Sequence, residues 1–192
     1  MAEQTVSSRT VDGVEYPAVG TYVIDVSHTR LGFAVRHMAV SKVRGEFRDF
    51  SGTLELAENP ADSKINVTIQ AGSVDTHDDN RDAHLRTNDF FDAETHPTWT
   101  FTSTAIRPRS ADEWDVDGDL TIRGVTRQVT LDATLEGVVD DPYGMHRVGF
   151  SASTSIVRDD FGVSFNAALE TGGVVVGKKV DIDLEVEATL QA

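Results

Sequence analysis

Apolar and polar residues alternate one by one along most of the chain, the pattern of a strand with one dry face and one wet face. In the clearest example, six apolar residues from Val180 to Leu190 alternate with five polar ones. Residues 129–136 repeat the pattern, with the apolar side chains at the odd positions. An amphipathic helix needs an apolar stripe with a period of about 3.6 residues, so these segments are predicted to be strands.

Less regular alternation extends the prediction to eight main strands. They cover residues 31–39, 46–56, 64–71, 99–106, 114–122, 126–139, 148–156 and 175–190, and residues 22–26 are a candidate ninth. Turn residues such as Asn59-Pro60 and Arg123-Gly124 lie between many of them. Short turns favour antiparallel neighbours, and closure of eight such strands removes every exposed edge. We therefore expect an all-β, eight-stranded antiparallel up-and-down barrel.

One segment, residues 76–92, departs from this alternation. Either Asp78 or Asp79 can cap a short helix over Arg81–Arg86, because an aspartate at this position accepts a hydrogen bond from the first helical turn. We expect the helix to cover one mouth of the barrel, with Phe90-Phe91 filling that mouth.

Two further stretches are not predicted to be barrel strands. Residues 159–173 contain Phe161 and Phe165 and are expected to flank a mouth. Residues 1–19 are interpreted either as a poorly ordered leader or as a peripheral hairpin. The expected division is a flexible leader over residues 1–19 and a single barrel domain over residues 20–192.

Composition excludes several classes of function. With 192 residues, the chain is long enough for one domain with a real core. It has no cysteine, which excludes disulfides, thiolate metal sites and cysteine nucleophiles. Its 17 basic and 32 acidic residues give a net charge of −15, which argues against nonspecific binding to nucleic acid or adsorption to anionic lipid surfaces.

The sequence also bears on location. No apolar stretch approaches the roughly 20 residues of a membrane-spanning helix, so we expect no stable membrane insertion. The first nine residues show neither a basic region nor an apolar run. Because a secretory signal needs both, the expected location is the cytoplasm.

Two places carry candidate chemistry. Imidazoles and carboxylates crowd the segment from His77 to His84, where they are candidate ligands of zinc or iron. The alternative is a capped, ion-paired helix that Arg81 and Asp82 hold to the barrel. His37 is expected inside the barrel, on the inward face of its strand. A buried imidazole needs a hydrogen-bond partner, either a neighbouring backbone or hydroxyl group or the polar head of a ligand.

Five blocks of sequence carry a family resemblance that covers about residues 20–190. They are Ile24–Thr29 with Phe33–Met38, Val43–Gly52, Ser73–Thr76 with Arg81–Arg86 and Asp89–Asp92, Gly118–Thr126, and Arg158–Gly162. Together they resemble the YceI-like family, also called the lipid- or polyisoprenoid-binding family.

The resemblance implies a lipocalin-like barrel whose lumen holds an isoprenoid lipid, either a polyprenyl compound or an isoprenoid quinone. It implies binding and carriage of that lipid with no enzymatic activity and no cofactor. Fourteen-residue strands give a barrel roughly 35 Å tall, which suits an elongated apolar chain. Small residues at strand positions, Gly45 and Gly118 among them, are expected to leave space inside.

The residues expected to line the ligand are apolar and lie at inward strand positions or near a mouth. They are Phe33, Val35, Phe47, Phe101, Leu120, Leu131, Leu135, Phe150, Ile156, Phe161, Phe165, Ile182 and Leu184. The candidates for contact with a head group can supply positive charge or a hydrogen-bond donor. They are His37, Arg36, Arg81, His84, Arg86 and Lys178.

Two other functions stay open. One is a metal-dependent enzyme or metal-binding protein that uses the His77–His84 segment. The other is a ligand-free structural or stress protein with a solid barrel, to which lipids and hydrophobic dyes do not bind. The expected partner is otherwise the lipid alone, and a symmetric homodimer is the default oligomer.

Overall fold

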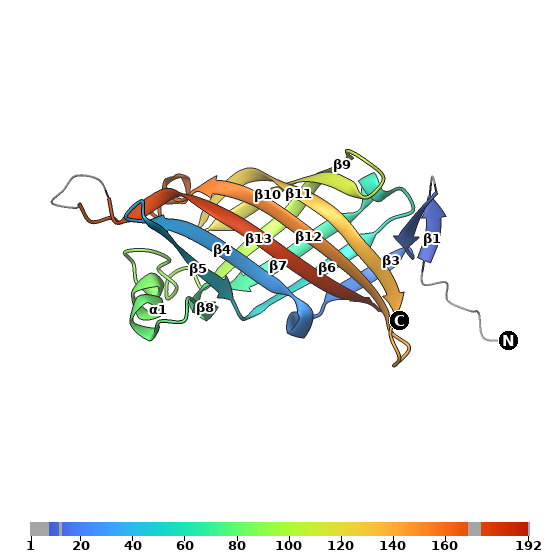
Figure 1. Cartoon of the computed structure of the whole chain (residues 1–192), viewed down its shortest axis with the longest axis horizontal. Coiled ribbons are helices and arrows are strands. Elements are labelled where there is room, and N and C mark those ends of the chain that lie inside the picture. Colours follow the sequence, from blue (N-terminus) through green and yellow to red (C-terminus); the bar gives the residue numbers. More distant parts are fainter. Residues whose placement is uncertain (1–7, 12, 169–173, 192) are drawn as a thin grey trace.

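The computed structural model describes residues 8–11, 13–168 and 174–191, which form an elongated barrel of long tilted strands (Figure 1). The strands are β1 Ser8–Val11, β2 Val14–Pro17, β3 Gly20–Ile24, β4 Arg30–His37, β5 Ser41–Phe47, β6 Phe50–Leu56, β7 Lys64–Gln70, β8 Val74–Asp75, β9 Thr98–Pro108, β10 Glu113–Ile122, β11 Val125–Asp140, β12 His146–Val157 and β13 Val176–Leu190. The helix α1 spans Asp79–Arg86, and single 3-10 turns are η1 Val26–His28, η2 Pro60–Asp62, η3 Ala71–Ser73 and η4 Arg158–Phe161. No helix in the described ranges is long and apolar enough to cross a membrane.

Antiparallel pairing runs once around the barrel and closes it. The order is β3, β6, β7, β9, β10, β11, β12 and β13, and β13 returns to β3. Three of the eight strand positions are interrupted: β4 continues β3 after η1, β5 leads into β6, and β8 continues β7 after η3. The predicted fold, an eight-stranded antiparallel barrel with one short helix near a mouth, is confirmed.

Sequence patterning misplaced the interruptions. The segment predicted as one strand over residues 46–56 is two strands, because pairing breaks at residues 48–49 and β5 begins earlier, at Ser41. The candidate ninth strand is β3. It is not an additional barrel strand, because β3 and β4 pair with successive parts of β13 and together form one of the eight strands. The short strand β8 was not predicted, since two residues are too few to show a period of two.

The hairpin β1–β2 covers one mouth. Tyr16 is buried there with its ring edge-on to Trp114, at 5.8 Å between ring centroids, and its hydroxyl donates to the carbonyl of Ala111. The guanidinium of Arg9 donates to the carbonyl of Ala57 at 2.6 Å. Of the two interpretations of residues 1–19, the hairpin describes the part from Ser8 onward, whereas residues 1–7 lie outside the described chain.

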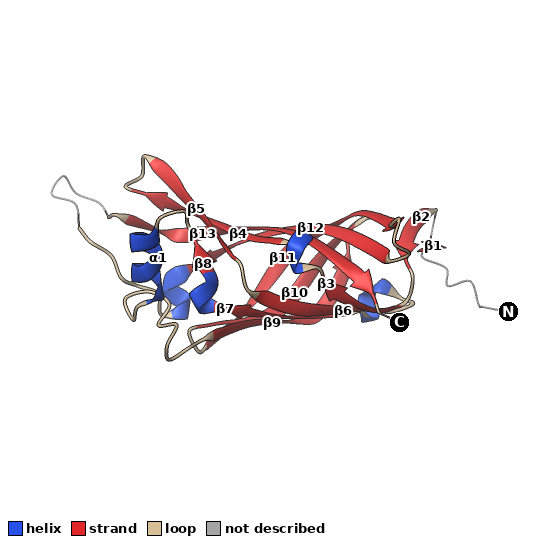
Figure 2. Ribbon diagram, turned by 90° about the horizontal axis from the view of Figure 1, so that it is seen from below, coloured by secondary structure: helices blue, strands red, loops and turns tan. Residues whose placement is uncertain are grey.

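The helix α1 lies at the opposite end (Figures 1 and 2). Asp78 caps it by accepting a hydrogen bond from the backbone of Arg81 at 3.0 Å. Asp82 is buried and accepts from the amide of Thr76 at 3.0 Å, while Arg81 Nε donates to the Thr76 hydroxyl at 2.7 Å. Arg86 donates to backbone carbonyls of η3 and β8. The predicted attachment of the helix through Arg81 and Asp82 is therefore confirmed.

Aromatic side chains after the helix fill this mouth. Phe90 and Phe91 are both buried, as is Phe161 from η4. Arg123 connects the two loops, because its guanidinium donates to the carbonyl of Phe90 at 3.1 Å and to that of Gly162 at 2.9 Å. The predicted role of Phe90 and Phe91 at the mouth is confirmed.

An ion-pair network holds the hairpin end of the barrel together. Arg147 of β12 donates to the carboxylates of Asp25 at 2.7 Å, Asp141 at 2.8 Å and Glu187 at 2.5 Å. Hydrogen bonds, from Ser27 first and then from Arg147, lower the pKa of Asp25. Arg147 also lowers the pKa of Asp141. The network joins the cap of η1, the β11–β12 turn and β13.

Two inward glycines make room for aromatic rings on neighbouring strands. A Cβ atom at Gly118 would overlap the ring of Phe101, and one at Gly45 would overlap the ring of Phe33. The space that these glycines were expected to leave empty is therefore occupied. As a result, each ring lies against the barrel wall.

We expect Gly118→Ala to lower the free energy of unfolding by about 1–3 kcal/mol, because the new methyl group overpacks against Phe101 and the adjacent backbone. Urea unfolding measures the change. Gly137→Ala is the matched control, since no atom lies within 4 Å of its added Cβ, and we expect a change within about 0.5 kcal/mol. Equal effects of the two substitutions would contradict this packing.

We expect the stability difference between the wild type and Arg147→Gln to depend on pH. Asp25 and Asp141 have lower pKa values in the folded protein than the ordinary 3.8, so their contribution is present above that pH. It is lost as the pH falls through the folded-state values, because both carboxylates then bind protons. Unfolding measured between pH 7 and about pH 3 should show the difference shrinking with acid; a constant difference would argue against the network.

Candidate functional site: the apolar lumen

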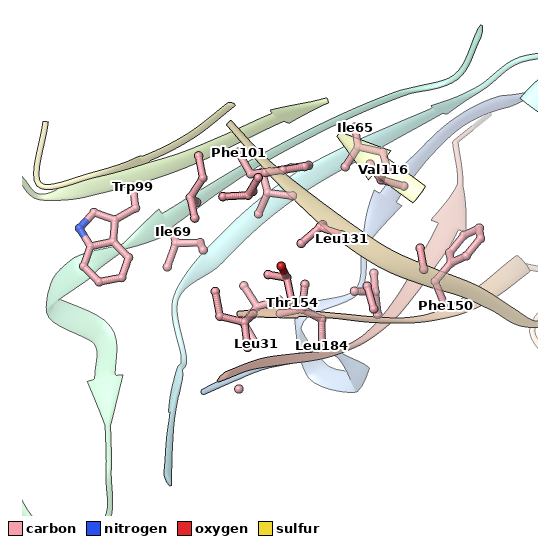
Figure 3. Close-up of a pocket in the computed structure, with 18 of the residues that line it drawn as sticks. Leu31, Ile65, Ile69, Trp99, Phe101, Val116, Leu131, Phe150, Thr154 and Leu184 are labelled. Atoms are coloured by element: carbon pink, nitrogen blue, oxygen red, sulfur yellow. The ribbon is translucent and has the colours of Figure 1, made fainter. Parts of the chain in front are cut away.

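The inward faces of the strands enclose an apolar cavity of about 310 Å³ (Figure 3). Its lining runs from Tyr16 at the hairpin end to Phe90 and Phe91 at the helix end. Within the described chain, the polar exceptions in this lining are two arginines and two hydroxyl residues, Arg9, Ser63, Thr154 and Arg158, besides the polar atoms of aromatic rings. The lining includes no histidine, carboxylate, lysine or cysteine among the described residues.

The two arginines use their charge on backbone carbonyls. Arg9 holds the hairpin to the loop before η2. Arg158 is buried at the helix end, where it donates to the carbonyls of Val163 at 2.6 Å, Phe165 at 2.9 Å and Gly177 at 2.9 Å. Burial lowers the pKa of Arg158. These contacts fix the loops that close the lumen.

Four aromatic rings gather where the lumen meets the helix. Trp99 contacts Phe47 at 4.9 Å and Phe91 at 4.7 Å between ring centroids, and Phe33 lies 5.8 Å from Phe47. The indole Nε1 of Trp99 is buried with no hydrogen-bond partner among the described atoms. Edge-to-face packing of this kind produces a rigid apolar wall.

The lining of the lumen and an outer groove share residues along a seam between β11 and β12. The pairing of these strands stops at Asp132 and Ser153, so the part of β12 from Thr154 onward pairs with β13 alone. Thr154 and Ile182 line the cavity and also an outer groove. Figure 3 shows the Thr154 oxygen among the carbon atoms of neighbouring side chains. The outer groove also contains four aspartates, Asp115, Asp132, Asp181 and Asp183.

The structure brings twelve of the thirteen residues predicted to line a ligand into this lining. They are Phe33, Val35, Phe47, Phe101, Leu120, Leu131, Leu135, Phe150, Ile156, Phe161, Ile182 and Leu184. Phe165 lies outside the lining, with its ring 5.2 Å from those of His84 and Phe90. Contact between these side chains and a ligand stays a prediction.

The predicted head-group residues do not converge on the lumen. Arg81 and Arg86 hold the helix, as described above. His84 Nε2 lies 2.8 Å from the Asp89 carboxylate, and Lys178 Nζ lies 2.7 Å from Asp159. These four side chains therefore already have partners outside the lining.

The prediction that His37 points into the lumen is wrong. Val35 is the last lining residue of β4, and the strand continues to His37, which pairs with Ser41 beside the β4–β5 turn. The alternation of sides holds, but at this level the lining includes Val176, the partner of His37 on β13, and not His37 itself. Arg36, on the other face, is exposed.

The predicted metal segment does not assemble a metal site. His77 Nδ1 lies 3.3 Å from Asp75, whereas His84 pairs with Asp89, so the two imidazoles have different partners. Across the described ranges, the one group of three nearby ligand residues is Asp25, His28 and Glu187. There the guanidinium of Arg147 already bonds both carboxylates, which makes the cluster an ion-pair network.

Sequence reasoning left out many side chains of the lining, and four of them, Trp99, Thr154, Arg158 and Arg9, show which kinds of signal were present or absent. Trp99 and Thr154 had a usable signal, because each lies two positions from a predicted inward residue on the same strand, Phe101 and Ile156. Arg158 and Arg9 had no such signal. A buried arginine whose partners are carbonyls of distant loops cannot be recognised from alternation.

Comparison with known proteins agrees with the fold. The YceI-like domain matches residues 22–188. Protein YceI of Escherichia coli O6:H1 is 41% identical over 165 residues, which cover 85% of this chain and 83% of that protein. The crystal structure of Burkholderia cenocepacia BcnA is 25% identical and has a TM-score of 0.76, with 86% of this chain and 99% of that chain covered.

A third similar structure is a polyisoprenoid binding domain from Saccharophagus degradans implicated in plant cell wall breakdown. It is 16% identical with a TM-score of 0.69, and the match covers 91% of this chain and all of that one, 100%. At this identity the likeness shows a shared fold. The domain match and the identity to protein YceI show the family directly: this chain belongs to the YceI-like family.

Proposed function

We propose that the protein binds a long-chain isoprenoid lipid in its lumen and carries it without changing it chemically. The observation that carries the proposal is the lining, which is apolar from the hairpin end to the helix end. The cavity volume of about 310 Å³ lies at the lower end of the range for small-molecule pockets, about 300–1,000 Å³. A slender chain suits a long, narrow space of this size better than a compact ligand does.

Binding of such a lipid is a transfer between two apolar environments. Each methylene group removed from water contributes about 0.8 kcal/mol, but a long isoprenoid resides in a membrane before it binds. The net binding free energy is therefore the small difference between the free energy of the lipid in the bilayer and its free energy in the lumen. A carrier benefits from this near balance, because it must release the lipid as well as take it up.

The contacts of the cationic residues favour an uncharged head group, such as that of an isoprenoid quinone, over a diphosphate. A diphosphate in the lumen needs free cations that face it, but Arg81, Arg86 and Lys178 already bond carbonyl, hydroxyl or carboxylate oxygens. Arg36 is exposed and lies outside the lining. The outer groove at the β11–β12 seam offers an anion no free cation either, because its Arg109 pairs with Asp115 and Asp132. A neutral head group needs no free cation in the lumen or in the outer groove.

The composition of the lining supports carriage rather than catalysis. Acid–base and nucleophilic catalysis need a titratable or nucleophilic group within reach of the substrate. The described lining offers arginines bonded to carbonyls and the hydroxyls of Ser63, Thr154 and Tyr16, with no general base beside them. We infer a binding protein on this ground.

A substitution that fills the lumen tests the proposal. Ala152 and Ala133 face each other across β11 and β12 and both line the cavity, so Ala152→Trp should obstruct it. We expect native mass spectrometry and solvent extraction to find a neutral isoprenoid on the purified wild type, and at least tenfold less on Ala152→Trp. Ser153→Trp, one residue along on the outer face, is the matched control and should retain the lipid.

Three outcomes would contradict the proposal. The first is a wild type that neither carries a lipid nor takes up an added isoprenoid quinone. The second is equal loading of Ala152→Trp and the wild type. The third, an anionic isoprenoid diphosphate in the lumen, would overturn the uncharged head group. Thermal unfolding of both tryptophan variants shows whether the barrel remains folded.

A further inference from the structure

The positive charge of this acidic chain is unevenly distributed. Residues 34–44 and 174–180 contain no acidic residue, although the whole chain has 32. The same two segments contain five of its 17 cations, Arg36, Lys42, Arg44, Lys178 and Lys179. A local positive surface can therefore exist on a protein with a net charge of −15.

The two segments lie side by side. Residues 34–44 are the end of β4, its turn and the start of β5, which pair as an antiparallel hairpin. Residues 174–180 lead into β13 beside β4, where the amide of Met38 donates to the carbonyl of Val175 at 2.9 Å. We call this surface, residues 34–44 and 174–180, the basic tip. In Figure 2 the β4–β5 hairpin projects past the body of the barrel at the α1 end.

Aliphatic side chains stand exposed at the end of the basic tip. Val40 is 81% exposed, Val174 is 47% exposed and Met38 is 40% exposed. The other end of the barrel also exposes an apolar side chain, Tyr143 at 90%. There, however, the neighbouring residues in the turn are acidic, Asp140-Asp141. In the basic tip, by contrast, the exposed aliphatic side chains share their two segments with five cations and no acidic residue.

Repulsion between two cations of the basic tip destabilises the β4–β5 hairpin. Arg36 and Lys42 are directly opposite each other on β4 and β5, and like charges in that position destabilise a sheet. All three lysines of the basic tip have acidic partners, because Lys42 and Lys179 pair with Asp181 and Lys178 pairs with Asp159. Arg36 and Arg44 are the two cations of the tip that have no ion pair in the described part of the chain. An anionic partner would relieve this repulsion.

We propose that the basic tip docks the α1 end of the barrel on a bilayer surface that contains anionic lipids. The cations meet lipid phosphates, and Val40, Met38 and Val174 enter the headgroup region. A nucleic acid or other polyanion would use the cations but leave the aliphatic side chains in water, so the combination selects a membrane. The net charge does not prevent docking, because salt screens charges beyond roughly 10 Å.

Docking in this orientation would bring the mouth filled by Phe90 and Phe91 to the membrane, where an isoprenoid lipid resides. The inference goes beyond the proposed function and rests on a different surface. Vesicle binding by the tip and lipid content of the lumen are measured separately, so either can fail alone.

Co-sedimentation with vesicles tests the proposal. We expect the wild-type protein to bind vesicles of phosphatidylcholine and phosphatidylglycerol in equal parts, but not vesicles of phosphatidylcholine alone. Raised salt should weaken the binding. The double variant Arg36→Glu, Arg44→Glu should lower the partition coefficient at least tenfold, because each cation near an anionic surface changes it roughly fivefold. Val40→Asp should lower it several-fold.

Matched variants outside the basic tip control for net charge and for general stickiness. Lys64→Glu and Arg127→Glu make the same charge change at exposed positions, and Tyr143→Ser removes an exposed ring at the far end. We expect all three to bind as the wild type does. Equal loss in these controls, binding that is insensitive to Val40→Asp, or no preference for anionic vesicles would each overturn the proposal. All substituted residues are exposed, and thermal unfolding verifies that the variants fold.

Discussion

An eight-stranded barrel encloses a space just wide enough for its own side chains to fill or for one slender ligand to occupy. In this protein the packing of the inward aromatic residues decides whether side chains fill the interior or leave space for a ligand. Gly45 and Gly118 let the rings of Phe33 and Phe101 lie against the wall, where they would otherwise cross the lumen. The cavity exists because these large side chains are accommodated between strands.

The same packing explains why polar ties concentrate at the two ends. Apolar side chains of the lining offer no hydrogen-bond donor to the backbone carbonyls of the closing loops, and a buried carbonyl without a donor destabilises the fold. Arg9, Arg123 and Arg158 supply several donors each to carbonyls that lie far apart in the sequence. The enclosed lumen therefore accounts both for the apolar lining in the middle of the barrel and for the arginines that bond loop carbonyls at its two ends.

The sequence predicted the barrel well because its signal is local. Alternation in segments such as Val180–Leu190 indicates directly which side chains face inward. A short motif predicts the capped helix α1 with either Asp78 or Asp79 as its cap, and the structure selects Asp78. How far the cavity extends along a strand is not determined by the local sequence of that strand. His37 keeps the inward phase but is not part of the lining, although its partner on β13, Val176, is. Local sequence also does not show that Arg81 and Arg86 donate hydrogen bonds to backbone carbonyls. From the sequence alone, both residues look like cations that are free to bind a ligand.

The central claim is that the lumen holds the lipid, and intrinsic fluorescence tests it most directly. The chain has two tryptophans, and both Trp99 and Trp114 line the cavity, one near each end. Titration of delipidated protein with an isoprenoid quinone, a natural quencher, should reduce the emission of both in single-tryptophan variants and saturate at a single ligand per chain. If neither emission changes, or if quenching rises without saturation, the lipid does not occupy the lumen and the account is wrong.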